Sequence, residues 1–141
     1  MAATYGFEFR YRECGKPPTI LDLLCKDTDT LTKGDIVNLE TGELDLGATA
    51  DTALCGTVME TASGTDSTTR FKVIVDADAV YGVTDANARL VGAGLDIAGT
   101  TGAMTVAAGT NDDLVVVAES SATQETLVKI HPTQHWQYTA A

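Results

Sequence analysis

LTKGDIVNLETGELDLGATADTALCGTVME, residues 31–60, contains two short apolar runs around a Thr-Gly-Glu turn, then an Ala/Thr/Asp loop and a third apolar run. Gly and Asp mark the turns, and Ile, Val and Leu fill the runs between them, which is typical of short strands joined by hairpins. The stretch therefore predicts the opening of a small, twisted β-barrel. It has no catalytic motif, so we expect function to lie in the protein's surface and its partners.

The rest of the body repeats this pattern of short strands and turns. Seven or eight strands with turn signals about every 8–12 residues predict an all-β barrel or sandwich. The segment 19–27, TILDLLCKD, fits either a short helix or a strand. The predicted strands cover residues 35–39, 43–46, 54–60, 70–75, 79–83, 104–107, 114–119 and 126–131.

The first thirty residues have a different composition from the body. Aromatic residues alternate there with small or charged ones: Tyr5, Phe7, Phe9 and Tyr11 with Gly6, Glu8, Arg10 and Arg12. Period-2 alternation indicates a half-buried strand, which is either the first strand of the barrel or an arm that adds a strand to a partner. The segment GKPP, residues 15–18, breaks regular structure directly afterwards. We therefore predict an extended N-terminal arm, residues 1–30, and a β-barrel domain, residues 31–141.

The charge of the chain is strongly acidic and unevenly spread. Nine Lys and Arg stand against 20 Asp and Glu among 141 residues, a net charge of −11. Residues 1–33 hold five basic and five acidic residues, whereas residues 34–141 hold four and fifteen. An acidic body argues against nucleic acid and anionic membranes as partners. No apolar run approaches the roughly 20 residues of a membrane span, and the N-terminus does not have the pattern of a secretion signal, so we expect synthesis in a cytoplasm.

The residues that could carry chemistry form no convincing site. Cys14, Cys25 and Cys55 make no close-spaced pair, which fits a reduced compartment and small buried apolar side chains. His131 and His135 are four apart, but Pro132 interrupts the helix that a shared metal would need.

Asp76 and Asp78 could flank a cation, but a pair of solvated turn carboxylates is the simpler interpretation. The Gly-rich segments 92–94 and 99–102 lack the lysine and the strand-to-helix context of a phosphate loop. We expect no catalytic residue, no metal and no cofactor, and an unrecognised enzyme is the weakest of the alternatives.

From Asp35 onward the chain resembles the head decoration, or cement, proteins of tailed phages. About 100 residues share the strand order and turn pattern of that family, without a single diagnostic motif. The stretches that carry the resemblance are Lys33-Gly34-Asp35 before IVNL, LCGTV (54–58), RFKVIVDADAVYGV (70–83), ARLVGAGLDIAGTTGAMTV (88–106), LVVVAES (114–120) and HPTQHWQ (131–137).

The resemblance implies a small β-barrel or β-tulip protein that sits on the outside of an icosahedral virion, often as a trimer, and clamps adjacent major capsid subunits. It implies no catalytic residues. The alternatives are another phage structural module, such as a tail tube or fibre, or a bacterial surface β-sandwich. The residues expected to bind the partner are Tyr5, Phe7, Phe9, Arg10, Tyr11 and Arg12 in the arm, with Trp136 and Tyr138 near the C-terminus.

Overall fold

A computed structural model describes residues 6–26, 30–60, 62–63, 69–85, 87–120 and 125–139, and it shows an all-β protein. Helical structure among these residues is confined to a 3₁₀ turn, η1 (Pro132–Gln134), and one helical turn, α1 (Trp136–Thr139). The strands are β1 (Phe7–Arg12), β2 (Ile20–Cys25), β3 (Thr30–Leu31), β4 (Ile36–Glu40), β5 (Glu43–Leu46), β6 (Leu54–Thr57), β7 (Ala62–Ser63), β8 (Arg70–Ile74), β9 (Ala79–Thr84), β10 (Gly94–Thr100), β11 (Ala103–Ala108), β12 (Leu114–Ser120) and β13 (Glu125–Ile130).

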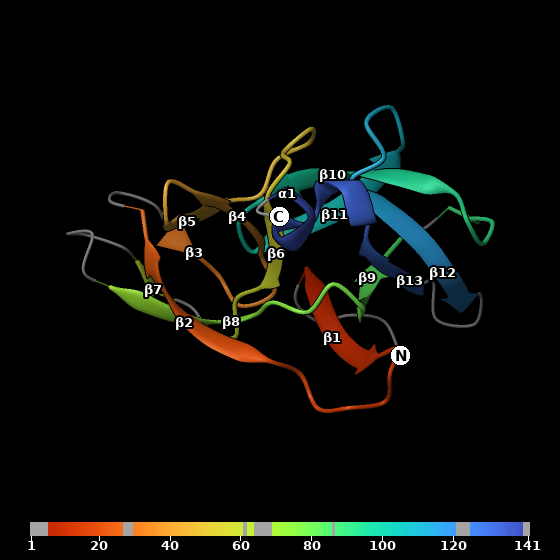
Figure 1. Cartoon of the computed structure of the whole chain (residues 1–141). Helices are drawn as coiled ribbons and strands as arrows, with labels where there is room; N and C mark the ends of the chain where they lie inside the picture. Colours follow the sequence, from red (N-terminus) through yellow and green to blue (C-terminus); the bar gives the residue numbers. More distant parts are fainter. Residues whose placement is uncertain are drawn as a thin grey trace.

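Two main sheets make up the molecule (Figure 1). The six-stranded sheet has the order β1-β9-β13-β12-β10-β11 and is antiparallel throughout. The five-stranded sheet has the order β6-β4-β5-β2-β8, in which β2 and β5 form a parallel pair. Strands β3 and β7 pair separately. The predicted all-β class is therefore confirmed, and the undecided segment 19–27 contains a strand, β2.

Two apolar clusters form the core. The larger one fills the space between the inner face of the six-stranded sheet and residues such as Ile36, Leu54 and Ile74 of the other sheet. The smaller one lies against the five-stranded sheet and includes both Cys25 and Cys55. Alternate residues of a strand enter the same cluster, for example Ala79, Tyr81 and Val83 of β9, as the period-2 pattern requires.

The hairpin in the opening stretch forms where the sequence predicted it. Glu40 pairs with Glu43, so Thr41 and Gly42 alone make the turn. Both turn residues have positive φ, 47° and 84°, which is the backbone of a two-residue type I′ hairpin. The tight turn fixes the register of β4 against β5 and places Leu39 opposite Leu44.

The prediction of a separate N-terminal arm is wrong for the described part of that segment. Strand β1 pairs with β9 along its length, with Phe7 opposite Val83 and Arg12 opposite Ala79. Phe7 is only 1% exposed and belongs to the larger core cluster. Strand β2 lies inside the five-stranded sheet. The alternation of aromatic and charged residues in β1 thus reflects a sheet with one buried face, which was the other interpretation of the pattern.

Buried aspartates join the two sheets. Asp113, at the start of β12, accepts hydrogen bonds from the backbone N–H of Ile97 in β10 (3.0 Å) and of Ala50 in the β5–β6 loop (2.9 Å). Asp35, before β4, accepts from the N–H of Thr32 and from that of Gly102 in the β10–β11 turn, both at 2.9 Å. Neither carboxylate is exposed. Each one therefore links backbone of the five-stranded sheet to backbone of the six-stranded sheet.

Replacing Asp113 with Ala is expected to lower the free energy of unfolding by about 2–4 kcal/mol, because it leaves two backbone N–H groups without an acceptor. Urea denaturation measures this change. The matched control is Glu40→Ala, since the Glu40 side chain is 54% exposed and its ion pair with Lys26 is long, at 4.0 Å. This variant should change the free energy of unfolding by no more than about 0.5 kcal/mol. Equal stability of the two variants would contradict the linking role of Asp113.

Candidate binding surfaces

The cysteines are not placed for nucleophilic chemistry. Cys25 and Cys55 are buried in the smaller core cluster, and Cys14 is exposed. Burial raises the pKa of the Cys55 thiol to about 12, so the thiolate is not formed near neutral pH. The expectation of small buried apolar side chains is thus confirmed for Cys25 and Cys55, but not for Cys14.

The two histidines do not form a site. His135 is 1% exposed, and burial lowers its pKa below the ordinary value, so the ring is neutral. The Nδ1 atom of His131 interacts with Thr133, whose N–H donates to it over 3.3 Å. Within the described residues, no group of three or more His, Cys, Asp or Glu side chains is arranged to hold a metal ion.

Asp76 and Asp78 both form hydrogen bonds with other parts of the protein. Asp76 is buried and accepts the N–H of Thr19 at 2.6 Å, and its other oxygen lies 3.5 Å from Arg12. Asp78 accepts from Arg12 at 2.8 Å and from the N–H of Cys14 at 3.2 Å. Burial tends to raise the pKa of Asp78, but these hydrogen bonds outweigh it and leave the pKa below its ordinary value. The interpretation as a solvated turn carboxylate is therefore wrong for Asp76, which is buried, whereas the Asp78 side chain is 26% exposed. The pair connects β1 to the segment before β2.

The predicted partner-binding residues have different environments. Phe7 is in the core, and Phe9 is half-buried with its ring edge-on to Tyr81 at 6.2 Å. Trp136 packs on the smaller cluster and donates its indole N–H to Val75 C=O at 3.2 Å.

Of the eight residues, Tyr11 is the one described as a large exposed apolar side chain, at 45%. Arg10 and Arg12 are held in ion pairs. Tyr5 and the side chain of Tyr138 lie outside the described residues.

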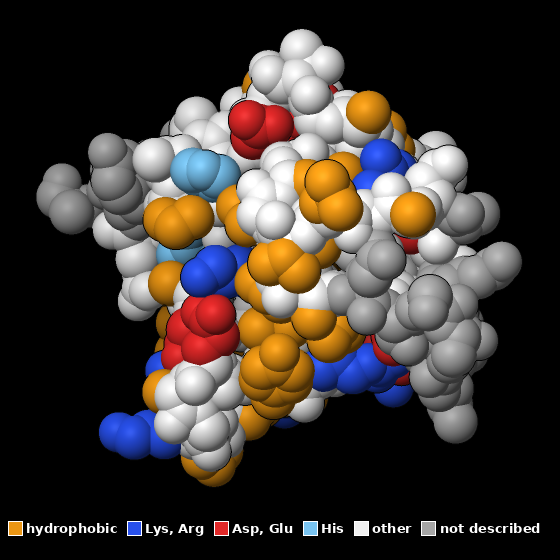
Figure 2. All heavy atoms as spheres, turned by 90° about the vertical axis from the view of Figure 1, so that its right-hand side faces the viewer, with side chains coloured by type: hydrophobic (Ala, Val, Ile, Leu, Met, Phe, Trp, Pro, Cys, Tyr) orange, Lys and Arg blue, Asp and Glu red, His pale blue; other side chains and the backbone are white. Residues whose placement is uncertain are grey.

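Tyr11 belongs to an apolar strip across the outer face of the six-stranded sheet, the face turned away from the core. Tyr11 pairs with Val80, which lies between the inward-facing Ala79 and Tyr81 and so points outward, although it is 0% exposed and offers no surface itself. The same alternation places Leu127 and Val115 on this face, each partly exposed. Figure 2 shows hydrophobic side chains gathered across the middle of the side on which β9, β12 and β13 lie. The strip was not foreseen from the sequence, since it combines residues of four strands.

A loop with two further apolar residues lies beside this strip. The N–H of Gly92 donates to Val116 C=O, and the N–H of Val116 donates to Ala93 C=O, so the loop runs along β12. Leu90 and Val91 in it are 82% and 70% exposed. Exposed apolar side chains that cluster in this way mark interaction surfaces.

Charged groups around the outer face are neutralised in pairs. Arg10 bonds to Glu125 and lies 3.3 Å from Glu8, while Lys129 lies 3.0 Å from Glu13. Arg10 and Glu125 cross directly over Gly82, where a Cβ atom would lie 1.9 Å from the Glu125 carboxylate. A glycine at this position therefore lets the ion pair lie flat on the sheet.

Unbalanced acidic charge lies instead around β4, β5 and the loop that follows. Glu40, Glu43, Asp45 and Asp51 gather there, and Lys26 lies 4.0 Å from Glu40 and 3.9 Å from Asp45. Burial raises the pKa of Asp51, and the nearby carboxylates raise it further, although the N–H of Ala48 acts in the opposite direction. Acidic side chains therefore outnumber basic ones around the β4–β5 hairpin, whereas the charged side chains named above on the outer face of the six-stranded sheet are paired.

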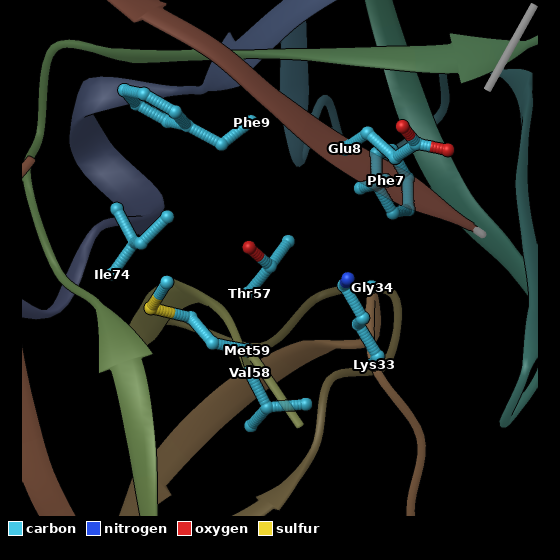
Figure 3. Close-up of a pocket in the computed structure, with 9 residues that line it drawn as sticks. All are labelled: Phe7, Glu8, Phe9, Lys33, Gly34, Thr57, Val58, Met59 and Ile74. Atoms are coloured by element: carbon cyan, nitrogen blue, oxygen red, sulfur yellow. The ribbon is translucent and has the colours of Figure 1, made fainter. Parts of the chain in front are cut away.

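A groove of about 280 Å³ opens between the two sheets (Figure 3). One wall is the edge of β1, from Phe7 to Phe9, and the other comes from the Lys33-Gly34 turn, the end of β6 with Met59, and Ile74. Met59 is 39% exposed at this site. The lining is mostly apolar, and among the described residues that form it Glu8 and Lys33 are the ionisable ones.

No protein-family model matches the chain, and a search of curated proteins finds no match. None of the helices in the described residues is long and apolar enough to cross a membrane.

The lowered pKa of His135 predicts a pH-dependent stability. Because the unfolded chain protonates this ring near pH 6.5 and the folded chain does so only at lower pH, stability is lost as the pH falls below 6.5. We expect the free energy of unfolding to decline between pH 6.5 and 5, and the decline to be smaller in His135→Asn. Urea titrations at several pH values measure both slopes, and identical slopes would exclude a contribution from His135.

Proposed function

We propose that this chain is a non-enzymatic structural protein that binds the outside of an icosahedral phage head and stabilises contacts between major capsid subunits. The resemblance of residues 35–137 to head decoration proteins supports the proposal, as does the placement of the candidate reactive groups in structural roles. The observation that carries it is the contrast between the outer face of the six-stranded sheet and the rest of a chain with a net charge of −11.

The outer face is suited to lie against another protein. An interface must bury apolar area, which contributes about 25 cal/mol per Å², and must avoid burying unpaired charge. Tyr11, Leu127 and Val115 supply apolar area, and the charged side chains among them, Lys129 opposite Val115 and Arg10 over Gly82, are already in ion pairs. A partner that covers this face therefore does not bury an unpaired charge from these side chains.

The acidic five-stranded sheet is suited to face solvent. Its charge keeps copies apart in the host cytoplasm before a shell is available, because like charges repel and a high net charge favours solubility. In the proposal the chain is made in the cytoplasm and ends on the virion exterior. A trimer is the favoured assembled state, in which each copy contacts the major capsid protein.

In the proposed fold the five-stranded sheet closes into a small barrel. Its two edge strands, β6 and β8, approach each other: Val58 pairs with Val73, and the N–H of Met59 donates to Lys72 C=O at 2.9 Å. These contacts support closure of the sheet around the smaller core cluster. A closed sheet leaves fewer free edges for aggregation, which suits a protein needed in many copies.

Binding to purified, expanded, DNA-free phage heads tests the proposal. Wild-type protein is expected to co-sediment with heads, and Tyr11→Glu is expected to bind at least about tenfold more weakly, because it places an unpaired carboxylate in the interface. Tyr11→Phe should keep wild-type binding. Ile20→Glu is the matched charge control, since Ile20 lies on the other sheet and is 42% exposed, close to the 45% of Tyr11.

Two results would contradict the proposal. Failure of the wild type to bind heads, together with formation of rings or polymers on its own, would favour a tail-tube or fibre component. Equal loss of binding in Tyr11→Glu and Ile20→Glu would show that added charge, and not the outer face, determines the result. Thermal melting of each variant confirms that it is folded.

A further inference from the structure

We propose that β1 accepts a strand: its free edge and the groove beside it bind an extended, non-acidic segment of the major capsid protein. The identity of this partner rests on the proposed function. In this proposal the capsid protein donates the strand and β1 accepts it. An N-terminal arm would instead donate a strand to the shell.

The hydrogen bonds of β1 define which backbone groups face the groove. The N–H of Phe7 donates to Gly34 C=O at 2.9 Å and so points away from β9. Phe9 is two residues further along in unbroken register, opposite Tyr81, and alternate residues of a strand direct their backbone groups to the same side. The N–H and C=O of Phe9 therefore point toward the groove as well, where no described residue bonds to them.

The register of β1 also limits the length of the site. A β-bulge between Phe9 and Tyr11 interrupts the pairing with β9. The straight part of the edge therefore runs from Phe7 to Phe9, about 7 Å at the usual rise per residue. Gly34 already accepts the Phe7 N–H, so the groups open to a new strand lie beyond that N–H, toward Phe9. A residue placed opposite Phe9 in an antiparallel register would exchange two hydrogen bonds with it.

The walls of the groove favour a single strand over the edge of a second whole sheet. In Figure 3, Ile74, Met59 and the Lys33-Gly34 turn form a row opposite β1, and Thr57 lies between them. A volume of about 280 Å³ between these walls is enough for a few residues of extended chain, and not for another copy's sheet. The side chains of Phe9, Met59 and Ile74 offer apolar contacts to alternate residues of such a strand.

The charge of the molecule determines which capsid segment can bind in the groove. Glu8 and Lys33 both line the groove, Glu8 is already paired with Arg10, and the molecule as a whole carries −11, so the long-range field and not the lining disfavours an acidic segment. An acidic strand would be repelled, and a second copy of this chain brings a further −11. An uncharged or basic segment with alternating apolar residues is complementary to both the field and the lining.

Hydrogen–deuterium exchange of the wild-type protein, free and bound to expanded heads, tests the inference directly. In the free protein the Phe9 amide is expected to exchange rapidly, although its neighbours in β1 are protected by β9. On heads, the fragment containing residues 7–12 should gain one amide that exchanges at least tenfold more slowly.

Variants of Met59 provide the second readout. Met59→Glu places a charge in the groove and should weaken binding to heads at least tenfold, whereas Met59→Leu keeps the apolar lining and should bind within about threefold of wild type. Both variants should melt close to the wild type, because Met59 is 39% exposed.

The outcomes separate this inference from the proposed function. If heads bind but the Phe9 amide stays fast and Met59→Glu binds normally, the strand-accepting groove is wrong and the decoration role stands. If heads do not bind at all, selection from a random twelve-residue peptide library tests whether the groove accepts a strand. Peptides that bind the wild type at least tenfold more tightly than Met59→Glu would uphold it, and the absence of such peptides would overturn it. Selection of acidic peptides would contradict the charge argument.

Discussion

The arrangement of the two sheets depends on buried carboxylates that accept backbone N–H groups from both of them. Asp113 joins β10 to the β5–β6 loop, Asp35 joins the β10–β11 turn to the start of β4, and Asp76 joins Arg12 of β1 to Thr19 before β2. A buried carboxylate is costly unless donors surround it, so each of these positions is geometrically demanding. The groove lies between β1 of one sheet and the end of β6 of the other, the two sheets that these carboxylates join.

The structure also explains how an acidic protein can present a neutral face. Arg10 and Lys129 each form an ion pair on the six-stranded sheet, with Glu125 and Glu13, while around β4 and β5 the single cation Lys26 lies near two carboxylates, those of Glu40 and Asp45. Net charge alone would have suggested a uniformly repulsive surface. Its uneven distribution instead creates one side suited to contact and another suited to solvent, which is what a protein coating a shell requires.

Local patterns predicted most of the strands because the information for them is local. Alternation of apolar and polar residues in β8, and the Thr41-Gly42 turn, reflect constraints within a few residues of each other. Strand β10 was missed, since its Gly and Ala residues have low strand propensity and its place is set by pairing with β11.

The pairing of β1 with β9, about 70 residues away, has no local signal, so the sequence pattern alone does not distinguish this edge strand from a free arm. The same holds for the candidate surfaces. The apolar strip combines residues from β1, β9, β12 and β13, and the groove combines segments from both sheets. Aspartates that follow a strand look like turn residues in the sequence, and only the fold shows that Asp76 and Asp113 are buried.

A cryo-electron microscopy reconstruction of heads saturated with the protein tests the central claim, that the outer face of the six-stranded sheet meets the shell. We expect density in which Tyr11 and Leu127 face the capsid and the β4–β5 hairpin points to solvent. Density with the acidic β4–β5 hairpin against the shell would contradict it.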